Sequence, residues 1–201
     1  KLDPEAVSQA IEGVAVACRK EGVALLGGET AEMPGVYPPG EFDLVGTLVG
    51  VVEKKHILDG SRVKAGDRLI GLPSDGLHTN GYSLARRIVT ERMGIEWSDP
   101  FPGADEDAAS VLLKNHRSYL RVLQPLLEDP ALHAMAHITG GGVSGNLPRT
   151  LGGHGARVDR SVVPVQNVFE QLREAGGVAL DEAWRAFNMG VGMILAVEAE
   201  D

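Results

Sequence analysis

The feature that most constrains this chain is a run of nine residues, Gly27 to Gly35, with the sequence GGETAEMPG. It follows a short apolar segment, Val23 to Leu26, which predicts a buried strand. Glycine has no Cβ and tolerates positive φ, so the backbone of such a loop can come close to a ligand. Glu29 and Glu32 add carboxylate oxygens, the ligands that Mg²⁺ prefers. The run therefore suits a magnesium-bound phosphate; the alternative is a tight turn with solvated acids.

Two later loops have the same character, and each comes where an apolar segment gives way to a helical pattern. They are residues 73–83 (PSDGLHTNGYS) and residues 137–149 (HITGGGVSGNLPR). Loops of this kind aim backbone N–H groups and helix N-termini at anions. One glycine cluster alone is more often a turn than a binding site. Three in one short chain are most simply explained if they converge on one cleft.

Titratable and polar side chains in or near these loops are the candidates for chemistry. His78 and His137 are candidate proton-transfer groups because imidazole titrates near neutral pH; the alternative for each is a histidine that bonds the loop backbone. Arg149 offers a fork-shaped phosphate donor. Asn188 either reaches a ligand or caps a turn. The remaining histidines, which receive no role, are His56, His116, His133 and His154. The sequence contains neither the ligand spacing of a zinc site nor a Walker loop.

Composition excludes several classes of partner. The 201 residues are 43% hydrophobic, enough for a real core, and carry a net charge of −9. That charge leaves no general basic field for a nucleic acid or an anionic membrane, so phosphate ligands need local donors. The single cysteine, Cys18, has no internal partner and lies on the apolar face of a predicted helix. No apolar run has membrane-spanning length, and we expect a cytoplasmic protein.

The first 55 residues predict one helix and two strands. Asp3 is a suitable N-cap, Pro4 a suitable first helical residue and Gly22 a suitable stop. Residues 23–26 and 42–52 predict strands, the second covered on both faces because it is apolar and β-branched. Charges and turn signals then follow, and we place a domain boundary near residue 55.

Residues 56–201 predict a second domain in which strands and helices alternate without the order of a simple doubly wound sheet, which indicates a mixed α+β or α/β fold. The expected strands are residues 68–72, 131–137, 156–158 and 193–197. The expected helices are residues 83–93, 108–115, 117–128, a short one inside the third glycine loop, 168–174 and 181–186.

Four motifs together resemble one enzyme family, the phosphoribosylformylglycinamidine cyclo-ligases, also called aminoimidazole ribonucleotide (AIR) synthetases. In chain order they are residues 27–35 (GGETAEMPG), 78–84 (HTNGYSL), 137–142 (HITGGG) with 146–149 (NLPR), and 187–193 (FNMGVGM). Related ATP users share single motifs: formylglycinamide ribonucleotide amidotransferase, selenophosphate synthetase and thiamine monophosphate kinase. The four motifs in this order are similar to the cyclo-ligase, and they span nearly the whole chain.

The resemblance implies ATP-dependent closure of formylglycinamidine ribonucleotide to AIR in purine biosynthesis, with ADP and phosphate released. It implies ATP and Mg²⁺ as cofactors, no nucleic acid or membrane partner, and a homodimer built by pairing the first domains. Residues 1–55 would be the C-terminal part of the ATP-binding domain, and residues 56–201 an α/β sandwich with glycine loops on its strands. Family members extend beyond both ends of this chain, so we expect a fragment.

The resemblance also implies roles for individual residues. Glu29 and Glu32 are the metal candidates, and His78 or His137 manages protons. The nucleotide-binding candidates are Gly27, Gly28, Glu29 and Thr30. The substrate- or phosphate-binding candidates are Asn80, Gly81, Ser83, Thr139, Gly140, Gly141, Gly142, Arg149 and Asn188. The alternatives are an ATP-dependent phosphotransferase of the same superfamily and a catalytically silent fragment.

Overall fold

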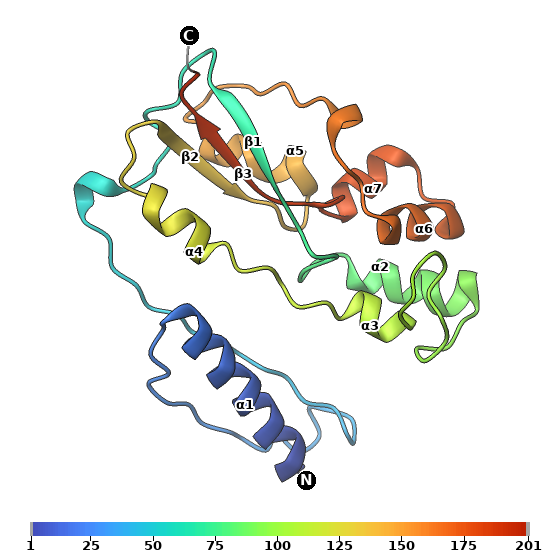
Figure 1. Cartoon of the computed structure of the whole chain (residues 1–201). Helices are drawn as coiled ribbons and strands as arrows, with labels where there is room; N and C mark the ends of the chain where they lie inside the picture. Colours follow the sequence, from blue (N-terminus) through green and yellow to red (C-terminus); the bar gives the residue numbers. More distant parts are fainter. Residues whose placement is uncertain (1, 200–201) are drawn as a thin grey trace. The chain divides into compact units, whose positions relative to one another are not determined.

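The structure is a computed structural model that describes residues 2–199 (Figure 1). The chain divides into two compact units, Lys1–Val52 and Glu53–Asp201. Among the described residues, no helix combines the length and the apolar character needed to cross a bilayer.

The first unit contains one long helix, α1 (Pro4–Glu21), as the sequence predicts. The Asp3 side chain accepts a hydrogen bond from the Glu5 N–H at 3.0 Å, and Pro4 occupies the first turn, where a missing N–H costs nothing. Gly22 ends the helix in the left-handed conformation, with φ of 71°. Local capping signals therefore determine both ends of α1.

The two strands predicted in this unit are wrong. Residues 23–32 and 41–53 have no regular secondary structure, and Leu26 and Val51 are 94% and 101% exposed. Burial of residues 42–52 on both faces is therefore also wrong. A strand needs a neighbouring strand to satisfy its backbone N–H and C=O groups, and within residues 2–52 neither segment pairs with another.

The second unit is built on a three-stranded antiparallel sheet in the order β1-β3-β2 (Figure 1). Its strands are β1 (Arg68–Pro73), β2 (Leu132–His137) and β3 (Val191–Val197). Three predicted strands are thus confirmed, β3 two residues longer than expected. The predicted strand at residues 156–158 is wrong: that segment is exposed and unpaired in the described chain.

The second unit also contains helices, mostly where the sequence predicts them. The bounds are α2 (Tyr82–Arg87), continued by a π-helical turn (Ile88–Met93), α3 (Ala108–Leu112), α4 (Leu120–Leu123), α5 (Gly142–Asn146), α6 (Asn167–Gly176) and α7 (Leu180–Ala186). The helices predicted at residues 108–115 and 117–128 are shorter than expected. Residues 113–119 leave the helical path there, and several of them contact the loop after β1.

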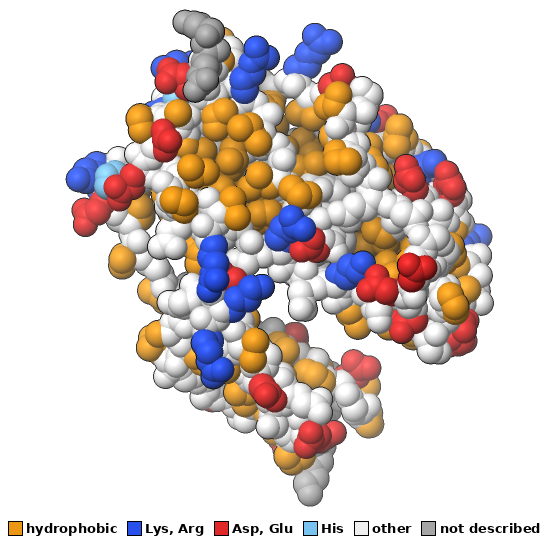
Figure 2. Space-filling model, in the orientation of Figure 1, with side chains coloured by type: hydrophobic (Ala, Val, Ile, Leu, Met, Phe, Trp, Pro, Cys, Tyr) orange, Lys and Arg blue, Asp and Glu red, His pale blue; other side chains and the backbone are white. Residues whose placement is uncertain are grey.

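The two faces of the sheet are covered unequally. One face packs on α2, α5, α6 and α7 in a large core that includes Ile194, Ala196 and Phe169. The other face carries a smaller cluster around Leu195 and is covered only in part by α4. Figure 2 shows hydrophobic side chains gathered on this second face. A mixed α+β fold with helices mainly on one side of the sheet is the result.

Candidate active site

The strand order brings three loops to one end of the sheet. Because β3 is antiparallel to both neighbours, Pro73 at the end of β1 pairs with Val191, and His137 at the end of β2 pairs with Met193. The loops after β1 and β2 and the turn before β3 therefore lie at the same end of the sheet. The prediction is therefore confirmed for the second and third glycine loops, which lie at one end of the sheet, whereas the first glycine loop lies in the other unit. A single cleft shared by the loops stays a prediction.

A buried amide holds two of these segments together. Asn188, 3% exposed, accepts hydrogen bonds through Oδ1 from the Ser74 hydroxyl (2.9 Å) and the Gly190 N–H (2.8 Å). Its Nδ2 donates to the carbonyl oxygens of Gly76 (2.8 Å) and Leu77 (3.2 Å). Both ends of the amide are bonded within the protein, as the turn-capping alternative expects. Contact of Asn188 with a ligand stays a prediction.

His78 is held in an unusual position at the end of this loop. Its φ is +60°, its side chain is 4% exposed, and Nε2 accepts backbone N–H groups of Asp75 (3.1 Å) and Arg117 (3.4 Å). Burial, followed by repulsion from the neighbouring His116, lowers the pKa of His78 to about 4. The ring is therefore neutral at pH 7 with its proton on Nδ1, a buried atom that no described residue contacts by a hydrogen bond.

An ion pair and a phenol clamp the 116–119 segment onto the same loop. The Arg117 guanidinium bonds both carboxylate oxygens of Asp75, one at 2.9 Å, and this hydrogen bonding lowers the pKa of Asp75. The Tyr119 hydroxyl donates to the Pro73 carbonyl at 2.8 Å, and burial raises the Tyr119 pKa to about 12. Both contacts fix the backbone that supports His78.

His116 joins the two candidate histidines, a role that the sequence did not indicate. Its ring stacks on His78 with centroids 3.9 Å apart and planes inclined by 17°. Its Nε2 lies 3.2 Å from Nε2 of His137. Burial, then the neighbouring His137, lowers the pKa of His116. Since His116 lies between two short helices and outside every motif, only the tertiary structure reveals it.

A second buried amide shapes the third glycine loop. Asn146 accepts the Thr139 hydroxyl at 3.0 Å and donates to the carbonyl oxygens of Thr139, Gly140 and Gly142. The Gly141 N–H donates to the Arg185 carbonyl of α7, and the Gly142 N–H donates to the Thr139 carbonyl. Phosphate binding by these glycines stays a prediction, and two of their N–H groups are already bonded within the protein.

The remaining candidates of the second unit lie around these loops. Asn80 approaches the third loop, because a Cβ on Gly140 would lie 3.3 Å from its Oδ1. Gly81 caps α2 with φ of 83°, and a Cβ there would meet the Phe187 ring. Ser83 is exposed on α2, and Arg149 is exposed in the 3-10 turn Leu147–Thr150 after α5.

The first glycine loop belongs to the other unit. Gly27, Gly28, Glu29 and Thr30 are exposed, and the Glu32 carboxylate accepts the Leu2 N–H at 2.8 Å. Among residues 2–199, one group of three His, Cys, Asp or Glu side chains lies close enough to share a metal ion. That group is the histidine trio, not the glutamates. The nucleotide and metal roles of this loop stay predictions.

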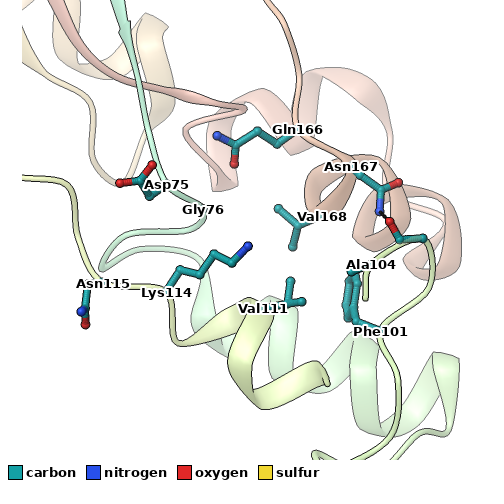
Figure 3. A pocket seen from close by; sticks show the side chains of 11 residues that line it. Asp75, Gly76, Phe101, Ala104, Val111, Lys114, Asn115, Gln166, Asn167 and Val168 are labelled. Carbon is teal, nitrogen blue, oxygen red and sulfur yellow. Dashed lines mark hydrogen bonds between the residues drawn. The ribbon is translucent and has the colours of Figure 1, made fainter. Parts of the chain in front are cut away.

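A hollow of about 530 Å³ lies beside the Asp75–Gly76 turn (Figure 3). Phe101, Val111 and Val168 form its apolar side, and the Lys114 side chain extends into it. The Lys114 ammonium pairs with Glu106 at 2.7 Å. The hollow shares Asp75 with the histidine loop, but the three imidazoles do not line it.

Comparison with known proteins gives two family matches and many relatives. Residues 1–52 match the N-terminal domain of AIR synthase related proteins, and residues 64–201 match their C-terminal domain. Proteins named phosphoribosylformylglycinamidine cyclo-ligase are 48% identical in Trichlorobacter lovleyi, 51% in a Synechococcus species and 46% in Desulfitobacterium hafniense. Each alignment covers 100% of this chain but only 57–59% of the relative.

The two matches adjoin the division between the structural units and leave few residues outside them. The recognised motifs are spread over both matched regions. The chain therefore belongs to the family of AIR synthase related proteins, of which it carries an N-terminal-domain segment and a C-terminal-domain segment.

Proposed function

We propose that this chain carries part of the active site of a phosphoribosylformylglycinamidine cyclo-ligase. The reaction closes formylglycinamidine ribonucleotide to AIR and converts ATP to ADP and phosphate. The observation that carries the proposal is the similarity of the whole chain, at 46–51% identity, to relatives bearing that name. The loops that converge at one end of the sheet are the segments that carry three of the four motifs.

The chemistry needs an activated amide and a proton acceptor. The formamide oxygen is phosphorylated, the amidine nitrogen attacks the resulting carbon, phosphate leaves, and the attacking nitrogen loses a proton. Holding the reacting groups together supplies much of the rate. Substrate contacts are assigned to the side chains that surround the loops: Asn80, Ser83, Thr139 and Arg149.

His137 is the better proton acceptor of the two candidates. Its side chain is exposed at the end of β2, whereas the His78 ring is buried, bonded through Nε2 and a weak base with a pKa of about 4. Neutral His78 carries its proton on the buried Nδ1 and holds the loop backbone through Nε2. The two histidines thus take different roles: His137 accepts a proton, and His78 positions the loop.

ATP and Mg²⁺ are assigned to the first glycine loop. The exposed Glu29 carboxylate is a suitable hard ligand, and Glu32 is a second choice because it already accepts the Leu2 N–H. Gly27, Gly28 and Thr30 would lie against the nucleotide. When bound, Mg²⁺ would neutralise charge on the phosphates.

A homodimer in the cytoplasm is part of the same proposal. Residues 42–52 form an exposed apolar segment in which Val45 and Val49 are 90% and 87% exposed. Apolar surface of this extent indicates an interface. Pairing of this segment as a strand in a dimer would satisfy its backbone groups.

The test uses a protein of the relatives' full length, incubated with formylglycinamidine ribonucleotide, ATP and Mg²⁺. We expect AIR and ADP in equal amounts. No turnover rejects the proposal, and a stable phosphorylated product without a ring identifies a phosphotransferase instead. ATP binding without hydrolysis identifies a silent protein.

Two variants with matched controls test the residue roles. We expect His137→Ala to lower kcat far more than His154→Ala, an exposed histidine outside the loops. Likewise, Glu29→Gln should raise the Mg²⁺ concentration needed for half-maximal activity, whereas Glu41→Gln should not. Equal behaviour of a variant and its control removes that residue from the mechanism.

A further inference from the structure

His116 and His137 turn their Nε2 atoms toward each other. Their Nε2 atoms are 3.2 Å apart, and both side chains are exposed. If only a hydrogen bond joins them, one Nε2 must carry a proton and the other must not. The two lone pairs could instead share one cation.

The spacing of the two rings matches that of two ligands on one metal ion. Two Zn–N bonds of about 2.0–2.1 Å at a tetrahedral angle place their nitrogens roughly 3.3 Å apart and the ring centres roughly 5 Å apart. The observed separations are 3.2 Å for the nitrogens and 5.2 Å for the ring centroids. Little side-chain movement is therefore needed to admit an ion.

His78 supports this pair instead of joining it. Nitrogen atoms of the three rings lie within 4.8 Å of one another, a looser limit than the spacing of true ligands. Nε2 of His78 is occupied by two backbone N–H groups, so its lone pair is not free. Its buried ring stacks on His116 at 3.9 Å and limits the rotation of the His116 imidazole.

We propose that His116 and His137 form a two-imidazole clamp for a divalent transition metal such as Zn²⁺, Co²⁺ or Ni²⁺. Imidazole nitrogen favours these ions, whereas Mg²⁺ prefers oxygen ligands. Water or an anionic oxygen completes the coordination. The clamp is separate from the magnesium site assigned to the glutamates, and it does not depend on the proposed cyclo-ligase activity. A bound ion would occupy the Nε2 lone pair of His137, so metal binding and proton acceptance at this atom exclude each other.

Direct binding tests the clamp. The 201-residue chain and three variants, His116→Ala, His137→Ala and His154→Ala, are titrated with Zn²⁺ by calorimetry in the presence of excess Mg²⁺. We expect the wild-type chain and His154→Ala to bind one ion alike, and the other two variants to bind at least tenfold more weakly. Cys18 is present in all four proteins, so it does not affect the comparison.

A second measurement needs no variant. Sub-stoichiometric Co²⁺ or Ni²⁺ should broaden the imidazole NMR signals of His116 and His137 before those of His56 and His154. The clamp is refuted if the wild-type chain binds no Zn²⁺, if only one of the two substitutions weakens binding, or if the paramagnetic ion broadens other histidines first.

Discussion

At the scale of single residues, burial gives two neighbouring histidines different chemistry. His78 is 4% exposed and bonded through Nε2, whereas His137 ends β2 with its side chain in solvent. Desolvation penalises the charged form of a buried imidazole, so the His78 ring stays neutral where an ordinary histidine titrates. One residue type is therefore present both as a buried neutral ring and as an exposed ring at the same end of the sheet.

The pH dependence of His78 follows from its lowered pKa. Between pH 6.5 and about 4 the unfolded chain binds a proton at this position and the folded chain does not, so folding stability falls as the pH falls through this range. The free energy of unfolding lost over this pH range is up to about 3 kcal/mol. We expect the His78 Cε1–H NMR signal to titrate with a midpoint near 4, and a midpoint near 6.5 contradicts the burial argument.

The buried pair formed by Asp67 and His133 concerns stability alone. Asp67 accepts hydrogen bonds from Nδ1 of His133 (2.7 Å) and from the Lys64 N–H (2.9 Å), and the two paired side chains are 8% and 3% exposed. Asp67→Ala leaves buried donors without an acceptor and should cost about 1–3 kcal/mol. Urea unfolding measures the loss, with the exposed Asp105→Ala as a control that should change little. Equal effects of the two substitutions would argue against a stabilising pair.

At the scale of elements, strand β3 packs closely against the loop that carries His78 because Gly192 has no side chain. A Cβ on Gly192 would meet the Tyr119 hydroxyl and would lie 2.7 Å from Cε1 of His78. The strand can therefore run directly beneath both rings. The buried amide of Asn146 donates a hydrogen bond to a carbonyl oxygen within the third loop, and that of Asn188 in the turn before β3 donates to a carbonyl oxygen of the loop after β1.

Substitution of this glycine should be coupled to Tyr119. Gly192→Ala forces the strand and the rings apart and should cost about 1–3 kcal/mol of unfolding free energy. The same change should cost less in a Tyr119→Phe background, because the atom nearest to the new methyl group is gone. Thermal unfolding of the four proteins gives the coupling energy. Additive costs would show that the two groups do not compete for space.

At the scale of the whole molecule, the two units differ in what they bury. The second unit has a large core against its sheet, whereas the first has a helix and an apolar segment that remains exposed over residues 42–52. Exposed, apolar and unpaired backbone promotes association between chains. We therefore expect the first unit to form an interface between chains.

Negative charge introduced into residues 42–52 should weaken the association between chains. We expect the chain to run as a dimer or larger species in size-exclusion chromatography with light scattering, and the Val45→Asp, Val49→Asp double variant to shift toward the monomer. Val162→Asp, at a position 76% exposed in the second unit, is the control and should leave the mass unchanged. A monomeric wild-type chain would contradict the proposed interface.

Sequence patterns predicted the parts of this fold that depend on nearby residues. Asp3, Pro4 and Gly22 mark the ends of α1 because a cap acts within one helical turn. Periodicity predicted the three strands of the sheet and helices α6 and α7, since one face of each packs on the core. The same reasoning failed for residues 42–52, because an apolar pattern specifies a strand but supplies no partner for its backbone.

By itself, the sequence determined the glycine loops, the capped helices and the family to which their motifs point. Only the tertiary structure decided which loops meet, that β3 lies between β1 and β2, and that His116 stands between His78 and His137. The reason is physical: capping and periodicity act over a few residues. The contact between His78 and Arg117 instead spans 39 positions and forms only when the chain has folded.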